Sequence, residues 1–341
     1  MGILTTVLIT ILIINVIVLA HEWGHYLAAR QADVPVQEFS IGFGWRLFAL
    51  RRRETVYSLR ILPLGGYVLL DLPETNDNST ASYTPGKKIT VALGGPLMNL
   101  GLALLIFIGI YCGVGMPHYS NQPVIGRVID KMPAGEAGIH TGDIVLSVNQ
   151  HPVNKWTDLT RLLGSVAPES SCSLVLQRGD KTISCRLTPT RDENSGRTVM
   201  GVEPELSYER KDLPQALAIG FTQTFRSCLA IISGLAGLVT GAESMGSMAG
   251  PIGLAGMVGD RLAFGWLELL GFTAFLSINL GIFNLLPIPF LDGGRILLAA
   301  IEAFRRRALD PEKEAVLHWL GLAFLMVLML YASYQDIVRL L

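Results

Sequence analysis

Residues 11–30 read ILIINVIVLAHEWGHYLAAR, an apolar run that passes without a break into His21-Glu22-Trp23-Gly24-His25. The run begins at Gly2, and Gly2–Ala20 is about as long as a bilayer-spanning helix, which takes about 20 residues. We expect one helix that continues through the motif to about Arg30, the first formal positive charge after it. At a rise of 1.5 Å per residue, His21 would lie roughly 13 Å deeper along this helix than Arg30.

The pattern His-Glu-x-x-His is typical of a zinc site. Residues i and i+4 share one face of a helix, so His21 and His25 can reach the same ion, and Glu22 can act on a water held there. The alternative is a pair of histidines packed inside a helix bundle. Unpaired ionisable groups at membrane depth cost a few kcal/mol each and normally mark function. The position of the motif therefore favours metal catalysis over packing.

The composition indicates a membrane protein. Of 341 residues, 50% are hydrophobic and 16% are charged, whereas soluble domains carry about a quarter charged residues; mean hydropathy is +0.44. The net charge of −1 gives no sign of a nucleic-acid partner. Three further apolar stretches predict spans: Ile89–Met116, Trp266–Leu286 and Val316–Tyr334. A fourth, Ala216–Thr240, is interrupted by Gln223 and Arg226.

Basic residues predict the orientation of the chain. Lys and Arg gather between the first two spans and again between the last two, from Arg295 to Lys313, so both loops should be cytoplasmic. Residues Tyr119–Pro214 and both termini would then face outward. Because no basic residue precedes the first apolar run and no cleavage pattern follows it, we expect that run to be a retained helix.

A third zinc ligand is expected at Asp292. Pro287 and Pro289 cannot continue a helix, so the chain should unwind at the end of the third span, which is tolerated at membrane depth only within protein or beside a cavity. The alternative is a broken helix end that Asp292 caps. Asp292 reaches the histidines only if its span runs inward, which requires that Ala216–Thr240 lie at the interface. The metal site thereby predicts four spans.

Two extra-helical elements are expected. Val36–Ile41 and Thr55–Leu62 are β-type runs joined by a Gly- and Arg-rich connection from Gly42 to Arg53, which indicates a hairpin. The polar stretch Leu72–Gly86 is typical of a loop.

A small soluble unit is predicted over Val124–Thr190. Its turn, Ala137-Gly138-Ile139 with Gly142-Asp143-Ile144, resembles that of bacterial PDZ domains; the alternative is a structural spacer. Since PDZ domains bind peptides by strand addition, we place a peptide terminus at the edge formed by Val124, Ile125 and Gly126. Short β-runs and one helix complete the unit: Val124–Ile129, Ile144–Val148, Trp156–Ser165, Cys172–Gln177 and Thr182–Leu187. Cys172 and Cys185 would lie diagonally across a hairpin, which favours free thiols.

Taken together, these motifs resemble the site-2 protease family of intramembrane metalloproteases, in its bacterial regulator-of-sigma-E, envelope-stress branch. The resemblance covers nearly the whole chain, and its motifs are residues 21–25, 42–44, 63–68, 94–99 and 284–294. It implies one Zn²⁺ per chain, held by His21, His25 and Asp292, with Glu22 as the catalytic base. It also implies substrate contacts from Asn279 and Asn284 and from a membrane-reentrant β element that includes Gly42, Gly44, Gly65 and Gly66.

The resemblance further implies single-span membrane proteins as substrates, such as anti-sigma factors already trimmed by an upstream extracytoplasmic protease, or leftover signal peptides. It places the chain in the bacterial inner membrane, with its active site toward the cytoplasm. One departure is a single PDZ unit where relatives often carry two. The alternatives are a catalytically silent PDZ-bearing scaffold, a membrane-tethered zincin with its site in water, and, weaker still, a transporter.

The predicted fold is therefore a polytopic α-helical membrane protein with four transmembrane helices, a membrane-reentrant β-hairpin and one inserted extracytoplasmic PDZ domain. Its expected divisions are a first membrane part (residues 1–117) and the PDZ domain (118–195). A linker with an interfacial amphipathic helix (196–262) and a second membrane part (263–341) follow.

Overall fold

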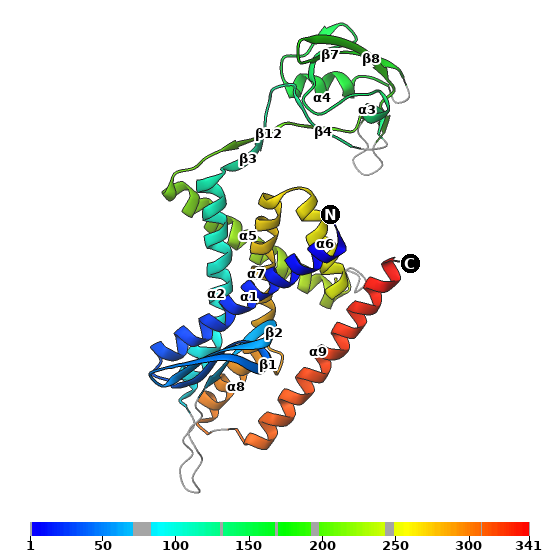
Figure 1. The fold of residues 1–341 in the computed structure, drawn as a ribbon. Helices are drawn as coiled ribbons and strands as arrows, with labels where there is room; N and C mark the ends of the chain where they lie inside the picture. The colour runs from blue at the N-terminus through cyan, green and yellow to red at the C-terminus, as the bar shows by residue number, and fades with distance from the viewer. Residues whose placement is uncertain are drawn as a thin grey trace. The chain divides into compact units, whose positions relative to one another are not determined.

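The computed structural model describes residues 2–70, 83–129, 132–167, 170–191, 198–242, 249–307 and 309–340. The chain divides into two compact units (Figure 1). One unit is Gly113–Lys211, and the other, here the helical unit, combines Met1–Cys112 with Asp212–Leu341. The predicted loop at Leu72–Gly86 falls mostly outside the described residues, but Pro85 and Gly86 already belong to a helix.

The helical unit consists mainly of long apolar helices. Its helices are α1 (Ile3–Gln31), α2 (Pro85–Gly113), α5 (Leu213–Thr240), α6 (Pro251–Ala263), α7 (Trp266–Asn284), α8 (Asp292–Arg305) and α9 (Pro311–Leu340). By length and composition, five of those in the described residues could cross a membrane, namely α1, α2, α5, α7 and α9. The chain is therefore a multi-pass membrane protein.

Helices α1 and α2 cross at a pair of glycines. A Cβ on Gly24 would lie 2.2 Å from the Gly94 carbonyl oxygen, and one on Gly94 would lie 2.5 Å from that of Gly24. Small residues at such a crossing let two backbones approach closely inside a membrane. As a result, the second half of α1, which carries the HExxH motif, lies against the first half of α2.

Helix α7 packs beside both α1 and α2. Ser277 Oγ donates a hydrogen bond to the Asn99 carbonyl of α2 at 2.8 Å, and Phe272 shares an apolar cluster with Ile13 and Ile17 of α1. Helix α7 ends at Asn284, and the chain is non-helical from Leu285 until α8 begins at Asp292. The predicted break is confirmed, whereas helix α8 was not anticipated.

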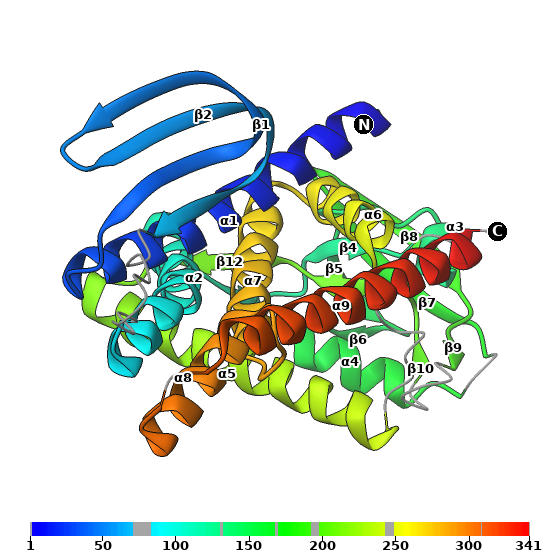
Figure 2. The ribbon, with the colours of Figure 1, turned by 90° about the horizontal axis from the view of Figure 1, so that it is seen from below.

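The predicted hairpin is a more extensive sheet. Strands β1 (Val36–Arg52) and β2 (Thr55–Leu70) are antiparallel. Each bends, so that Glu38 of β1 pairs with both Val56 and Leu69 of β2 (Figure 2). The expectation of a connection from Gly42 to Arg53 is wrong, because the strand runs through it. Gly42 and Gly44 permit the bend with φ of +88° and +87°, a region that side chains disfavour.

The second unit, Gly113–Lys211, contains a four-stranded sheet in the order β6-β5-β7-β8. Its strands are β5 (Ile144–Val148), β6 (His151–Pro152), β7 (Cys172–Arg178) and β8 (Lys181–Leu187), with helices α3 (Pro133–Glu136) and α4 (Trp156–Gly164). Ile125, Leu159 and Leu174 are fully buried in its core. The strands, the helix and the hairpin turn predicted for this PDZ-like unit are confirmed.

Strand pairing carries this unit past the predicted boundary at residue 195. Strand β11 (Val202–Pro204) pairs with β4 (Ile125–Val128), and β12 (Leu206–Glu209) pairs with β3 (Met116–Tyr119). The unit therefore extends to Lys211 and does not end at residue 195, while the rest of the expected linker, α5 and α6, belongs to the helical unit. Short strands β9 (Thr190–Arg191) and β10 (Thr198–Val199) also pair.

The edge at Val124, Ile125 and Gly126 is not open to a peptide. Glu205 N donates to the Val124 carbonyl, Ile125 N donates to the Asp143 carbonyl, and Gly142 N donates to the Ile125 carbonyl. A Cβ on Gly126 would lie 2.5 Å from the Pro204 carbonyl oxygen. The chain itself occupies both sides of this stretch, a pairing between distant segments that the sequence pattern did not reveal.

All four cysteines are free. Cys185 lies opposite Leu174, and Cys172 lies opposite Leu187, so the two thiols of the hairpin are diagonal, as predicted.

A buried ion pair joins Arg178, at the turn between β7 and β8, to Asp143, in the turn that contains Gly138 and Gly142. Asp143 is 0% exposed and accepts hydrogen bonds from Arg178 Nε at 2.7 Å and Nη2 at 2.8 Å, and from the His140 N–H at 2.9 Å. The Arg178 guanidinium is the main reason that the pKa of the Asp143 carboxyl lies below its ordinary value.

Because that pKa is lowered on folding, the pair stabilises the unit fully above the unfolded value of about 3.9 and loses its effect as the pH falls through the folded value. We predict that Asp143→Asn lowers the unfolding free energy of this unit by about 2 kcal/mol at neutral pH and flattens its acid dependence. Urea unfolding of the full chain, followed by fluorescence of Trp156 after replacement of the other four tryptophans, measures both. Glu203→Gln, which removes an exposed pair at 3.8 Å, serves as the control and should change little. A wild-type acid dependence in Asp143→Asn would contradict the prediction.

Candidate metal centre

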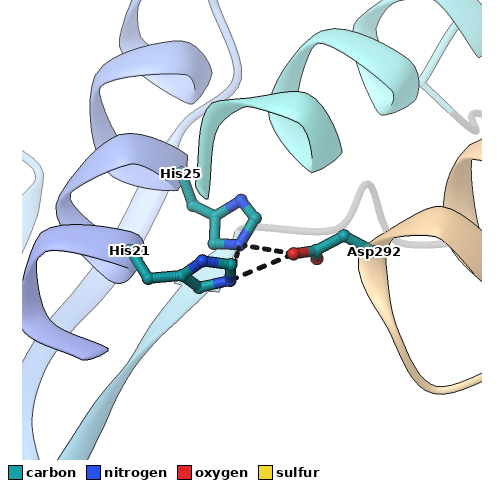
Figure 3. A group of neighbouring side chains, drawn as sticks. All are labelled: His21, His25 and Asp292. Carbon is teal, nitrogen blue, oxygen red and sulfur yellow. Dashed lines mark hydrogen bonds and ion pairs between the residues drawn. The ribbon is translucent and has the colours of Figure 1, made fainter. Parts of the chain in front are cut away.

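Two helices bring three ligand-type side chains together inside the helical unit (Figure 3). Asp292 Oδ2 lies 3.0 Å from His21 Nε2 and 3.3 Å from His25 Nε2. The two Nε2 atoms lie 3.1 Å apart. All three residues are buried, with exposed fractions of 6–9%. The structure thus unites the two histidines predicted from the motif with the aspartate predicted from a segment more than 260 residues away.

The arrangement fits a zinc ion. Around a tetrahedral zinc with bonds of about 2.0–2.1 Å, ligand atoms lie roughly 3.3–3.4 Å apart, close to the three separations found here. Two imidazoles and one carboxylate form a typical ligand set for catalytic zinc. Asp292 Oδ2 is buried and accepts no hydrogen bond from the described residues. A buried carboxylate oxygen is stabilised by a positive charge, and a metal ion between it and the two ring nitrogens would supply one.

Local sequence explains why Asp292 lies where it does. It is the first residue of α8, directly after the non-helical segment that contains Pro287 and Pro289. A Cβ on Gly293 would lie 2.2 Å from the Leu285 carbonyl oxygen, and one on Gly294 would lie 2.2 Å from that of Ile288. The two glycines let the segment fold back over the start of α8, which fixes Asp292 toward α1.

Helix α2 forms one wall of the centre. His25 Nδ1 lies 2.7 Å from the Val91 carbonyl oxygen, to which it donates a hydrogen bond, leaving Nε2 free for a metal. A Cβ on Gly95 would lie 2.4 Å from His25 Nε2 and 2.7 Å from His21 Nε2. Sequence reasoning singled out the Gly94-Gly95-Pro96 motif without a role for Gly95. Its role follows from the helix crossing, which presses this face of α2 against the imidazoles.

The sheet reaches the centre beside Glu22. A Cβ on Gly66 would lie 3.7 Å from Glu22 Cγ. Gly65 N donates a hydrogen bond to Asn15 Oδ1 of α1 at 2.8 Å. Sequence reasoning missed Asn15, although a lone amide inside an apolar run is a signal of its own. An apolar cavity of about 170 Å³ adjoins these residues and is lined by Ile11, Ile14, Val18, Phe43, Gly65 and Gly66.

The two expected substrate amides lie on α7. Asn279 and Asn284 are both half-buried. Within the described ranges of the chain, no hydrogen bond is found to either side chain.

An HExxH motif and a third ligand, the carboxylate of Asp292, that meet inside a bundle of apolar helices define a membrane-embedded zinc metallopeptidase. Comparison with known proteins agrees: a model of peptidase family M50 matches residues 9–328, and the chain belongs to this family. The predicted resemblance to site-2 proteases is thereby confirmed, and the protein is a zinc metalloprotease.

Curated relatives match over almost their entire length. The regulator of sigma-W protease RasP of Bacillus subtilis is 31% identical, over 98% of this chain and 99% of its own. The zinc metalloprotease RasP of Bacillus licheniformis is also 31% identical, over 99% and 100% respectively. A solved PDZ domain of an SdrC-like protein from Listeria monocytogenes is 18% identical over 25% of this chain and 87% of that domain, with a TM-score of 0.22.

Removing the space at Gly95 should disrupt the centre. We predict that Gly95→Ala lowers the zinc content of the purified protein at least tenfold, because the new methyl group would lie within 2.7 Å of both ring nitrogens and neither imidazole can retreat from a packed bundle. Metal analysis after dialysis against a weak chelator measures this. Gly101→Ala on the same helix, where a Cβ meets nothing within 4 Å, is the matched control and should retain zinc. Equal zinc content in both variants would show that Gly95 does not limit the site.

Proposed function

We propose that this metalloprotease hydrolyses peptide bonds within or near the transmembrane segments of single-span membrane proteins. The observation that carries the proposal is the burial of His21, His25 and Asp292 among membrane-type helices, with exposed fractions of 6–9%. A site built into the bundle serves substrates that enter from the lipid. The same geometry argues against a membrane-tethered zincin whose site lies in water.

The roles of the residues follow from their chemistry. His21, His25 and Asp292 would hold one Zn²⁺ per chain. When bound, the ion lowers the pKa of a coordinated water and polarises the scissile carbonyl. Glu22 accepts a proton from the water as the water oxygen bonds to the carbonyl carbon. Glu22 then donates that proton to the amide nitrogen as the C–N bond breaks. The products are a carboxylic acid and an amine, which together ionise to a carboxylate and an ammonium group, and Glu22 is regenerated.

A helical substrate must unwind before it is cut, because its backbone groups are otherwise paired within the helix. Sheet residues near Glu22 supply backbone partners for an unwound strand, and we assign this role to the element containing Gly42, Gly44, Gly65 and Gly66. Asn279 and Asn284, half-buried, would add side-chain amides. We place the sheet within the membrane, in line with the exposed apolar side chains of Trp45, Leu47 and Phe48.

The names of the relatives support a substrate class. The protease RasP of Bacillus subtilis is a regulator of sigma-W, and membrane-bound anti-sigma factors are single-span proteins of the kind proposed here. We therefore propose regulated proteolysis in envelope stress signalling, with prior trimming by an extracytoplasmic protease, in the bacterial inner membrane. Remnant signal peptides fit the same requirement for a single apolar span.

Four spans fit the packing of the helical unit. The start of α1, the end of α9 and helix α6 lie together: a Cβ on Gly259 of α6 would lie 3.2 Å from Thr6 Cγ2, and Asp336 of α9 accepts hydrogen bonds from Gly250 N and Gly253 N. Figure 1 shows α8 and the sheet at the opposite end of this unit. Helix α6 has 13 residues, about 20 Å, too short to cross.

The order of the helices supports a place for α5 at the membrane interface. Helix α2 ends, and α7 begins, at the end of the unit where α6 lies, so the segment between them crosses an even number of times. Since α6 does not cross, neither does α5. We propose that α5 lies at the interface, with unit Gly113–Lys211 and both termini outside and the metal centre toward the cytoplasm.

This topology predicts labelling by a membrane-impermeant maleimide. In a background lacking the four native cysteines, Gly241→Cys at the end of α5 should react from the extracytoplasmic side. Arg306→Cys, after α8, should react only when the membrane is permeabilised. Protection of Gly241→Cys in intact spheroplasts, with reaction after permeabilisation, would mean that α5 crosses.

The reaction itself is tested at Glu22. We predict that Glu22→Gln lowers cleavage of a membrane-embedded reporter at least a hundredfold, since a proton transfer by a positioned base contributes about 10²–10⁴-fold, while zinc content stays at the wild-type level. Mass spectrometry of the reporter fragments and metal analysis give the two readouts. Undiminished cleavage would refute the role of Glu22. Wild-type protein that binds zinc and cleaves nothing would favour the silent scaffold.

A further inference from the structure

The Asn99 side chain lies against the Nδ1 edge of the His21 imidazole, whereas Asp292 lies against the Nε2 atom. Asn99 Nδ2 lies 3.3 Å from His21 Nδ1, and Asn99 is 0% exposed. Its Oδ1 is buried and has no hydrogen-bond partner in the described part of the chain. A buried amide oxygen without a partner costs about 1–3 kcal/mol, and such an atom beside a metal ligand calls for an explanation.

Metal binding imposes a definite protonation state on His21. An imidazole that binds an ion through Nε2 is neutral and carries its proton on Nδ1. That N–H would then face the Asn99 NH₂ group, so that two donors would oppose each other. A half-turn of the amide exchanges Oδ1 and Nδ2, two groups of nearly equal size. The oxygen then accepts the His21 Nδ1–H, and the contact between two donors disappears.

We infer that Asn99 is a positioning residue that accepts a hydrogen bond from His21 Nδ1–H and thereby sets its metal-binding tautomer. This inference rests on the metal role proposed above. It completes a symmetry at the centre, because His25 Nδ1 already has an acceptor in the Val91 carbonyl oxygen at 2.7 Å. Helix α2 thus serves both ligands of α1, one through its backbone and one through a side chain.

The neighbouring helix holds Asn99 in place. Ser277 Oγ donates to the Asn99 carbonyl oxygen at 2.8 Å, and a Cβ on Gly281 would lie 3.4 Å from Asn99 Cβ. Helix α7 therefore supports Asn99 from behind while its amide faces α1. A residue held this firmly loses little further entropy when the hydrogen bond forms.

The size of the effect follows from other metal sites. Loss of a partner that orients a histidine ligand costs about 10–100-fold in metal affinity. The full-length protein in detergent is titrated with zinc in competition with a chelator of known affinity, for wild type and three Asn99 variants. Asn99→Leu and Asn99→Ala, which lack an acceptor, should weaken zinc binding about 10–100-fold. Asn99→Asp keeps a carboxylate oxygen in place and should bind zinc within about threefold of wild type or more tightly.

Thr273→Val is the matched control. Thr273 lies on α7, is 7% exposed, and its hydroxyl donates within its own helix to the Leu269 carbonyl at 2.8 Å. Its loss removes a buried hydroxyl from the same bundle without touching an imidazole, and zinc affinity should not change. The visible absorption of the Co²⁺-substituted protein provides a second readout, which should shift in Asn99→Leu and not in Thr273→Val.

The outcomes separate this inference from the proposed function. Wild-type protein that binds no zinc overturns the metal role itself. Wild-type zinc affinity in Asn99→Leu or Asn99→Ala overturns only the role of Asn99. Equal losses in Asn99→Asp and Asn99→Ala likewise overturn it, because a packing role would not distinguish an acceptor from its absence. If Asn99→Leu does not fold, the comparison of Asn99→Asp with Asn99→Ala decides.

Discussion

Three electron-donating ligand atoms lie within 3.3 Å of one another inside an apolar bundle. Without a cation between them, such atoms would repel one another. Burying a carboxylate and two imidazoles among membrane helices is unfavourable unless they share a positive charge. A shared ion would turn that cost into a stabilising junction between α1 and α8. The helices, the break before Asp292 and the crossing of α1 with α2 all serve to make this junction possible.

The junction between α1 and α8 depends on glycines, which have no side chain, as much as on the three ligand side chains. Gly24 and Gly94 let α1 and α2 approach until each Cβ would contact the other's carbonyl oxygen. That approach brings Gly95 under the two imidazoles, and at Gly95 no side chain fits. The close approach of the two backbones therefore makes α2 one wall of the site.

The sheet brings extended backbone beside the helix that carries the HExxH motif. Strands β1 and β2 bend and pair twice, so most of their hydrogen-bonding groups are satisfied within the element. Their apolar side chains face outward, and Gly66 lies beside Glu22. The tie from Asn15 to Gly65 N anchors this end of the sheet to the helix that carries the motif. Helix α1 therefore carries Glu22 and also holds the adjacent end of the sheet.

Much of this protein follows from local sequence. The helix through His21 and His25 depends only on residues within a few turns, and the prolines before Asp292 break a helix wherever they occur. Spacing and membrane depth therefore sufficed to predict that His21, His25 and Asp292 meet, where the long apolar stretches lie, and the hairpin of the second unit. The bend of β1 and β2, the partner that β11 provides for Val124–Gly126, and the contacts of Gly95, Asn15 and Asn99 were decided only by the tertiary structure. Each of these features is a meeting of segments far apart in the chain, and no periodicity within one segment specifies what will pack against it.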